Sequence, residues 1–108
     1  MMVTQIKNEE KLKEFVSEGQ VVLMIHKKEC PFCDKAMPWF EEFSETFTDR
    51  KFAEVEKDDI VTLLTHFNIE MYPTFVLINN GIIQDTFFGD TQKEKVKEFV
   101  SKEIKELE

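Results

Sequence analysis

An uninterrupted apolar run at residues 21–25 is followed almost at once by Cys-Pro-Phe-Cys at residues 30–33, and this succession constrains the fold most strongly. The run, Val-Val-Leu-Met-Ile, does not alternate with polar residues, which is typical of a strand buried on both faces of a sheet. Pro31 indicates that a helix begins directly after Cys30, because proline fits the first helical position, where its missing N–H has no intrahelical partner. We therefore expect an α/β fold with a central buried strand that leads into a helix.

Cys30 and Cys33 are the two cysteines of the chain, and their position at a helix start predicts redox chemistry. Free backbone N–H groups and the positive end of the helix dipole favour thiolate over thiol at Cys30. The thiolate is the form that attacks disulfides. Cys33 lies one helical turn further on and faces the same way, so it is within reach of a disulfide with Cys30 and can resolve a mixed disulfide.

A zinc site and a purely structural disulfide are alternatives for the same spacing. Structural zinc takes four ligands, and the histidines available to join the cysteines, His26 and His66, stand 40 residues apart without a metal-binding spacing. A CxxC pair beside a strand–helix–strand pattern is read first as a redox motif. We expect no metal and no bound cofactor, only a redox-active Cys30–Cys33 disulfide.

Length and charge limit the class of protein further. A chain of 108 residues is long enough for one core, so residues 1–108 are expected to form a single domain. The formal net charge of −8 argues against nucleic acid or an anionic membrane as partner, because both are bound through Lys and Arg. The first residues lack the pattern of a secretion signal, and no stretch approaches the roughly 20 apolar residues of a membrane span, so we expect a cytoplasmic protein.

The remaining pattern predicts the element order β-α-β-α-β-α-β-β-α, with strands at residues 3–6, 21–25, 51–56, 74–78 and 82–88. Helices are expected after a cap at Asn8, from Pro31 to about Phe47, over residues 60–67, and after a cap at Thr91. The last helix is predicted to bury Val96, Phe99, Val100, Ile104 and Leu107. The result is a central mixed sheet covered by helices on both faces.

Three further motifs stand at fixed distances from the cysteine pair. Pro38 falls five residues after Cys33, Tyr72-Pro73-Thr74 precedes a predicted strand, and Gly81 and Gly89 lie eight and sixteen residues beyond Pro73. In this combined spacing the chain resembles the thioredoxin family over essentially its whole length. The resemblance implies the thioredoxin fold, with Pro38 as its helix-kinking proline.

The resemblance also implies that Pro73 is cis and lies against the cysteine pair. In the family, the backbone of the preceding residue, here Tyr72, pairs with an extended substrate peptide as an added strand, so Tyr72, Pro73 and Thr74 are expected to bind substrate. An ordinary trans proline before a strand is the alternative. The dipeptide Pro31-Phe32 departs from typical thioredoxins and looks like that of glutaredoxins, whereas the layout of the chain fits thioredoxin.

A second departure concerns the groups that tune the pair. Thioredoxins carry a buried aspartate six residues before the first cysteine and a lysine on the next strand, and Met24 and Glu54 occupy these places here. Glu54 is a substitute proton acceptor if it faces the cysteines. His26, which replaces an aromatic residue, and Glu29, which precedes Cys30, are further tuning candidates. A solvated side chain is the alternative for Glu54 and for His26, whereas Glu29 is expected to disfavour the thiolate.

The leading hypothesis is a monomeric thiol–disulfide oxidoreductase with a role in cell redox homeostasis. It exchanges disulfides with protein substrates through a mixed disulfide and is restored by a reductase or a low-molecular-weight thiol. A glutathione-dependent, glutaredoxin-like reductase, suggested by Pro31-Phe32, is one alternative. A non-enzymatic redox sensor or adaptor, with a binding surface around Phe32, Trp39 and Tyr72, is the other.

Overall fold

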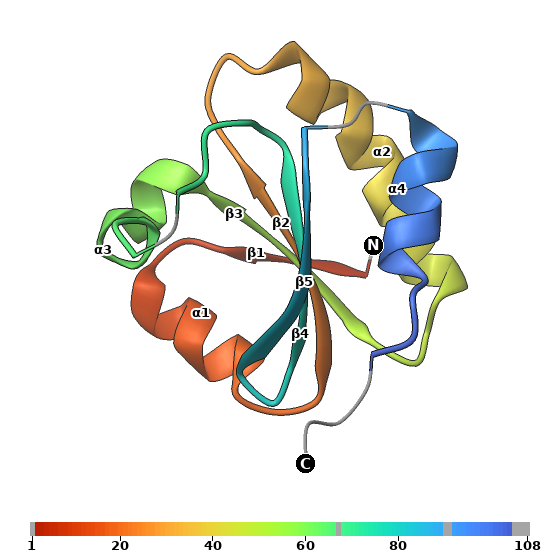
Figure 1. Cartoon of the computed structure of the whole chain (residues 1–108), viewed down its shortest axis with the longest axis horizontal. Helices are drawn as coiled ribbons and strands as arrows, with labels where there is room; N and C mark the ends of the chain where they lie inside the picture. The colour runs from red at the N-terminus through yellow and green to blue at the C-terminus, as the bar shows by residue number, and fades with distance from the viewer. Residues whose placement is uncertain (1, 67, 90–91, 105–108) are drawn as a thin grey trace.

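The computed structural model describes residues 2–66, 68–89 and 92–104, and it has the predicted order of helices and strands (Figure 1). The strands are β1 (Val3–Ile6), β2 (Gln20–His26), β3 (Lys51–Glu56), β4 (Thr74–Asn79) and β5 (Ile82–Phe88). The helices are α1 (Glu9–Val16), α2 (Pro31–Thr46), α3 (Val61–Leu64) and α4 (Lys93–Val100), with a 3₁₀ turn, η1 (Lys57–Ile60), before α3. The predicted α/β class is confirmed.

The five strands form one mixed sheet in the order β1-β3-β2-β4-β5. The central strand β2 runs parallel to β3 and antiparallel to β4, and β5 is an edge strand that pairs antiparallel with β4. Every residue from Val21 to Ile25 is buried. This confirms the prediction of a strand covered on both faces.

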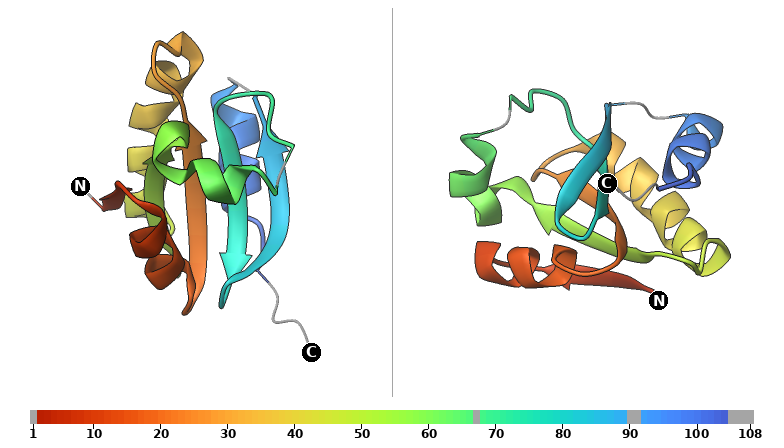
Figure 2. Two further views of the ribbon diagram at one scale, coloured as in Figure 1. Left: turned by 90° about the vertical axis from the view of Figure 1, so that its left-hand side faces the viewer. Right: turned by 60° about the horizontal axis from the view of Figure 1, so that its bottom comes forward.

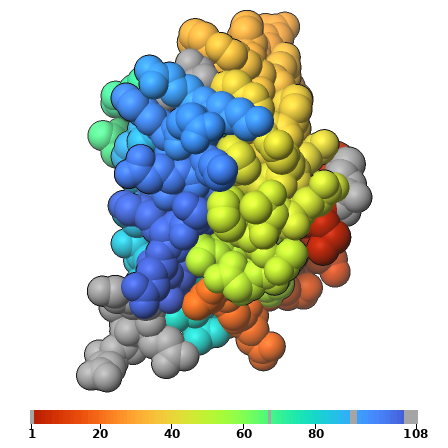
Figure 3. All heavy atoms as spheres, turned by 90° about the vertical axis from the view of Figure 1, so that its right-hand side faces the viewer, coloured from red at the N-terminus to blue at the C-terminus, as the bar shows by residue number. Residues whose placement is uncertain are grey.

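Helices form a layer on each face of the sheet: α1 and α3 lie on one side, α2 and α4 on the other (Figures 1 and 2). Alternate residues of β2 enter different cores, since Val22 and Met24 pack on the α2 and α4 side while Leu23 and Ile25 pack on the α1 and α3 side. Figure 3 shows α2 and α4 side by side on the face of the molecule that they cover. Both cysteines belong to this α2 and α4 core.

The third helix is shorter than the predicted span of residues 60–67. The chain makes the 3₁₀ turn first, and α3 ends where the Thr65 hydroxyl donates to the Thr62 carbonyl oxygen at 2.6 Å. Such a local bond competes with continued helix. The start of α3 is capped from a distance, because Glu9 Oε1 accepts from the backbone N–H groups of Thr62 and Leu63. Phe67 lies outside the described residues.

The last helix is also shorter than predicted. It begins after Gln92, and the expected cap Thr91 and the expected core residue Leu107 lie outside the described residues. Ile104 is buried as predicted, although α4 has already ended at Val100.

Arg50, which precedes β3, holds the end of α4 in place. Its Nη1 donates to the carbonyl oxygens of Val100 and Lys102 at 3.0 and 2.6 Å, and its guanidinium also binds both carboxylate oxygens of Asp49. Only 5% of the arginine side chain is exposed. A planar fork of donors suits this role, because it satisfies carbonyl groups that the helix leaves without partners.

Replacing Arg50 by Met, which keeps an aliphatic chain, should lower the free energy of unfolding by about 2–3 kcal/mol, since charged hydrogen bonds to the carbonyl groups of Val100, the last residue of α4, and of Lys102 just beyond it are lost. Urea unfolding followed by circular dichroism measures the change. Lys97→Met, at an exposed position of α4, is the control and should change stability by less than about 0.5 kcal/mol. Equal losses in the two variants would contradict this role of Arg50.

Candidate active site at the start of helix α2

The cysteine pair lies where the end of β2 leads into α2. Glu29 turns the chain with a left-handed φ of 54°, and Cys30 then adopts an extended conformation as the N-cap of α2, with Pro31 in the first turn. The backbone N–H of Cys33 donates to Cys30 Sγ at 3.1 Å. The sulfur therefore takes the capping position that an oxygen fills in most helices, as the sequence predicts.

Cys30 and Cys33 are joined by a disulfide and are almost fully buried, with 5% and 3% of their surface exposed. The two residues between them are exposed, and Phe32 extends into solvent with 57% of its surface accessible. The buried disulfide is thus bordered by two exposed residues. Trp39, one residue beyond Pro38 in α2, instead packs against the buried core.

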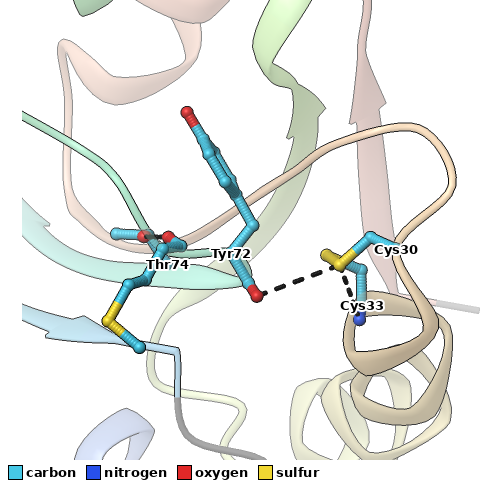
Figure 4. Close-up of a disulfide and its surroundings, with 5 residues drawn as sticks. Cys30, Cys33, Tyr72 and Thr74 are labelled. Carbon is cyan, nitrogen blue, oxygen red and sulfur yellow. Dashed lines mark hydrogen bonds between the residues drawn. A yellow bond between two sulfur atoms is a disulfide. The ribbon is translucent and has the colours of Figure 1, made fainter.

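The loop before β4 faces the disulfide. The Tyr72–Pro73 peptide bond is cis, and the Tyr72 carbonyl oxygen lies 3.9 Å from Cys30 Sγ, with the phenol ring pointing away from the sulfurs (Figure 4). In the dithiol form this oxygen is placed to accept from the Cys30 thiol. Pro73 and Thr74 are buried. The Thr74 hydroxyl donates to the Met71 carbonyl oxygen at 2.6 Å, and this hydrogen bond closes the loop from residue 71 to residue 74.

The surroundings of Tyr72 are mixed in charge. Lys27 Nζ lies 6.0 Å from the centre of the tyrosine ring. Burial raises the pKa of the phenol, and the charge of Lys57 opposes that shift. Because the net shift is upward from an ordinary value near 10, Tyr72 is neutral at physiological pH.

His26 and Glu54 meet on the cysteine side of the sheet. Glu54 stands opposite Met24 in the β2–β3 register, and strand alternation directs both side chains to the face of the α2 and α4 core. The His26 Nε2 and Glu54 Oε1 atoms are 3.6 Å apart, and the two side chains are 20% and 14% exposed. Met24 is fully buried. The structure thus brings two of the three tuning candidates together, whereas Glu29 is exposed at the turn.

Gly89 and Met71 complete the loop in a way that the sequence does not predict. The Gly89 N–H donates to the Pro73 carbonyl oxygen at 2.8 Å, and the Met71 side chain covers the glycine so closely that a Cβ atom there would lie 2.6 Å from Met71 Cε. The spacing of Gly89 from Pro73 indicates that the glycine matters, but no local pattern indicates Met71 as its neighbour. In the part of the chain that the structure describes, no three His, Cys, Asp or Glu side chains form a metal site.

A cysteine pair that caps a helix beside a cis-proline loop, on this mixed sheet, defines the class of thioredoxin-fold redox proteins. The Thioredoxin family model matches residues 3–102. The chain therefore belongs to the thioredoxin family.

Individual relatives agree with this assignment. The chain is 29% identical to thioredoxin of Mycoplasma genitalium over 96 residues, which cover 88% of this chain and 94% of the relative. It is 32% identical to thioredoxin of Gallus gallus over 83 residues, or 77% of this chain and 78% of the relative. Among solved structures, Plasmodium falciparum thioredoxin matches with a TM-score of 0.84 at 25% identity, covering 91% of this chain and 96% of that one.

Family membership makes the protein a thiol–disulfide oxidoreductase that acts on protein disulfides. Its redox-active group is its own disulfide, and thioredoxins need no bound cofactor. The family in general takes disulfide-containing proteins as substrates and is recycled by a reductase. The matches support the leading hypothesis from the sequence over the glutathione-dependent and adaptor alternatives.

Gly89→Ala should slow disulfide exchange as well as reduce stability by about 1–3 kcal/mol, because it strains a residue at φ 61° and displaces Met71 from beside Tyr72. Gly81→Ala is the matched control: its φ is 82°, so backbone strain is similar, but the nearest atom to a Cβ there is 3.9 Å away. Denaturant unfolding and the rate of insulin disulfide reduction distinguish the two. If both variants slowed the reaction alike, packing by Met71 would not matter to the site.

Proposed function

We propose that Cys30 is the nucleophile and Cys33 the resolving cysteine in the reduction of protein disulfides. The Cys30 thiolate attacks one sulfur of the client disulfide, whose other sulfur leaves as a thiolate and takes up a proton. Cys33 then gives up its proton and attacks Cys30 Sγ, which releases the second client thiol and forms the Cys30–Cys33 disulfide. The position of Cys30 Sγ, between the Cys33 N–H and the Tyr72 carbonyl oxygen, is the observation that carries this proposal.

We also propose that Tyr72, Pro73 and Thr74 bind the client. The Tyr72 carbonyl oxygen already lies beside the attacking sulfur, Cys30 Sγ, so a client strand paired with this backbone would hold its disulfide next to Cys30. Proximity of this kind lowers the entropic cost of the attack. Pro31 and the exposed Phe32 belong to the same surface and supply apolar contact to the client.

Glu54, paired with His26, is our candidate proton acceptor for Cys33. Resolution needs a base because an unperturbed thiol is largely protonated at neutral pH. The usual acid position holds apolar Met24, whereas Glu54 lies on the same side of the sheet as the cysteines and is mostly shielded from solvent. Glu29 acts differently in this proposal: its exposed negative charge next to Cys30 opposes the thiolate.

The same proposal covers the setting of the reaction. Residues 1–108 act as one monomeric domain in the cytoplasm, where a reductase or a low-molecular-weight thiol keeps the pair reduced. Among the described residues, no helix is both long and apolar enough to span a membrane. Sedimentation equilibrium on the reduced protein tests the monomer.

Serine variants of the two cysteines should fail at different steps. Cys30→Ser should reduce insulin disulfides no faster than the reductant alone, because no nucleophile remains. Cys33→Ser should lose turnover but accumulate a mixed disulfide through Cys30, since nothing resolves it. Non-reducing electrophoresis and peptide mass spectrometry identify the linked residue.

Either of two results would count against these roles. One is turnover by Cys30→Ser, and the other is a trapped client linked through Cys33. Full activity of Cys33→Ser on glutathionylated substrates would instead favour the glutathione-dependent alternative.

Glu54→Gln should slow resolution by about tenfold or more at neutral pH and leave the first attack unchanged, because only resolution needs the base. A chromogenic aromatic disulfide separates the steps, as it releases one coloured thiolate on attack and a second on resolution. The defect should shrink as pH rises toward about 8.5, where an unperturbed thiol ionises without help. Glu42→Gln, which removes an exposed partner of Lys93, is the charge-matched control. A resolution defect that is independent of pH would exclude Glu54 as the base.

A further inference from the structure

The face of the sheet opposite the cysteines contains an apolar cavity of about 300 Å³. Its floor is formed by β2 and β4 side chains, including Leu23 and Ile78, and its walls by Leu12 of α1 and Leu64 of α3. The helix α3 is only four residues long and ends at Leu64, which also lines the cavity. The cavity lies on the other side of the sheet from the active site, so a ligand bound in it would not depend on the proposed function.

Two apolar side chains at the cavity are exposed to solvent. Ile83 and Phe88 on the edge strand β5 have 43% and 46% of their surfaces accessible, although both line the cavity. Ile83 pairs with Ile78 in the β4–β5 register, which places it on the cavity face of the sheet. These side chains mark an opening through which an apolar group can enter from solvent.

Among the described residues that line the cavity, Lys13 is the one with a charged side chain. It is exposed on the last turn of α1 and forms no ion pair within the described part of the chain. The polar side chains in the lining, Asn68 and Thr86, are uncharged. In a protein with a formal net charge of −8, a lysine that has no acidic partner among the described residues, beside a mainly apolar cavity, gives this place a local preference for an anion.

We propose that this cavity binds an aliphatic monocarboxylate, with the chain inside and the carboxylate at Lys13. A closed apolar cavity of about 150 Å³ stays dry and takes up benzene, so a volume of about 300 Å³ has room for a chain of about eight to ten carbon atoms. Binding removes the exposed apolar surface of Ile83 and Phe88 from water, and the lysine selects the acid over an uncharged chain.

Titration with hexanoate, octanoate and decanoate, below the concentrations at which they form micelles, tests the proposal by calorimetry and two-dimensional amide NMR. Each added methylene should tighten binding about fourfold until the cavity is filled, from a gain of about 0.8 kcal/mol per buried CH₂. The amide shifts should fall on α1, β4 and β5 and not at the start of α2. Absence of saturable binding, or shifts centred on the cysteine pair, would overturn the proposal.

Matched variants locate the two ends of the ligand. Ile83→Trp narrows the cavity and should weaken decanoate binding by about tenfold or more. Ile82→Trp, at a neighbouring exposed position outside the lining, should leave the affinity for decanoate within about twofold.

Lys13→Met should weaken decanoate binding by about two- to fivefold and leave the affinity for decanol unchanged, because decanol has no carboxylate. Lys11→Met, on the same helix but outside the lining, should change neither affinity.

Insulin reduction by all four variants verifies that they are folded. Equal effects of the two tryptophan variants would overturn the site, and loss of decanol binding in Lys13→Met would overturn the role of the lysine.

Discussion

Burial of β2 on both faces is the constraint on which the rest of the structure depends. Residues Val21 to Ile25 place apolar side chains into two separate cores, so the sheet is stable only with a helical layer on each side. The same strand ends at His26, just before the turn that starts α2. The cysteines therefore follow shortly after a strand that is buried on both faces, and the Cys30 sulfur lies 3.9 Å from the Tyr72 carbonyl oxygen.

The cores on the two faces of the sheet differ in the side chains that build them. On the α2 and α4 side, Phe40 contacts both Phe52 and Phe75, with ring centres 5.2 and 5.8 Å apart, and these rings belong to the same core as the cysteines. The other core is mainly aliphatic, and the short α3 leaves a cavity there. The core that contains the disulfide is thus built around aromatic rings, whereas the cavity of about 300 Å³ belongs to the aliphatic core on the opposite face.

Local signals account for what the sequence predicts well. Asn8 caps α1 through its own side chain, and Pro31 marks the start of α2, because each acts within one turn of its position in the chain. The features that the sequence does not predict depend on distant partners: Glu9 caps α3, Arg50 binds the end of α4, and Met71 covers Gly89. The length of α3 is a different case, since residues 60–67 carry a helical apolar pattern but the helix ends at Leu64, next to the local hydrogen bond from Thr65 to Thr62.

The position of the proposed base has an energetic consequence. A carboxylate at position 24 would be fully buried, and burying an unpaired charge there would cost several kcal/mol unless its pKa rose. The Glu54 side chain keeps 14% of its surface exposed and its Oε1 atom lies 3.6 Å from His26 Nε2, so an acid there keeps some contact with solvent and has a polar neighbour. Moving the acid from β2 to β3 therefore frees the central strand from that desolvation penalty.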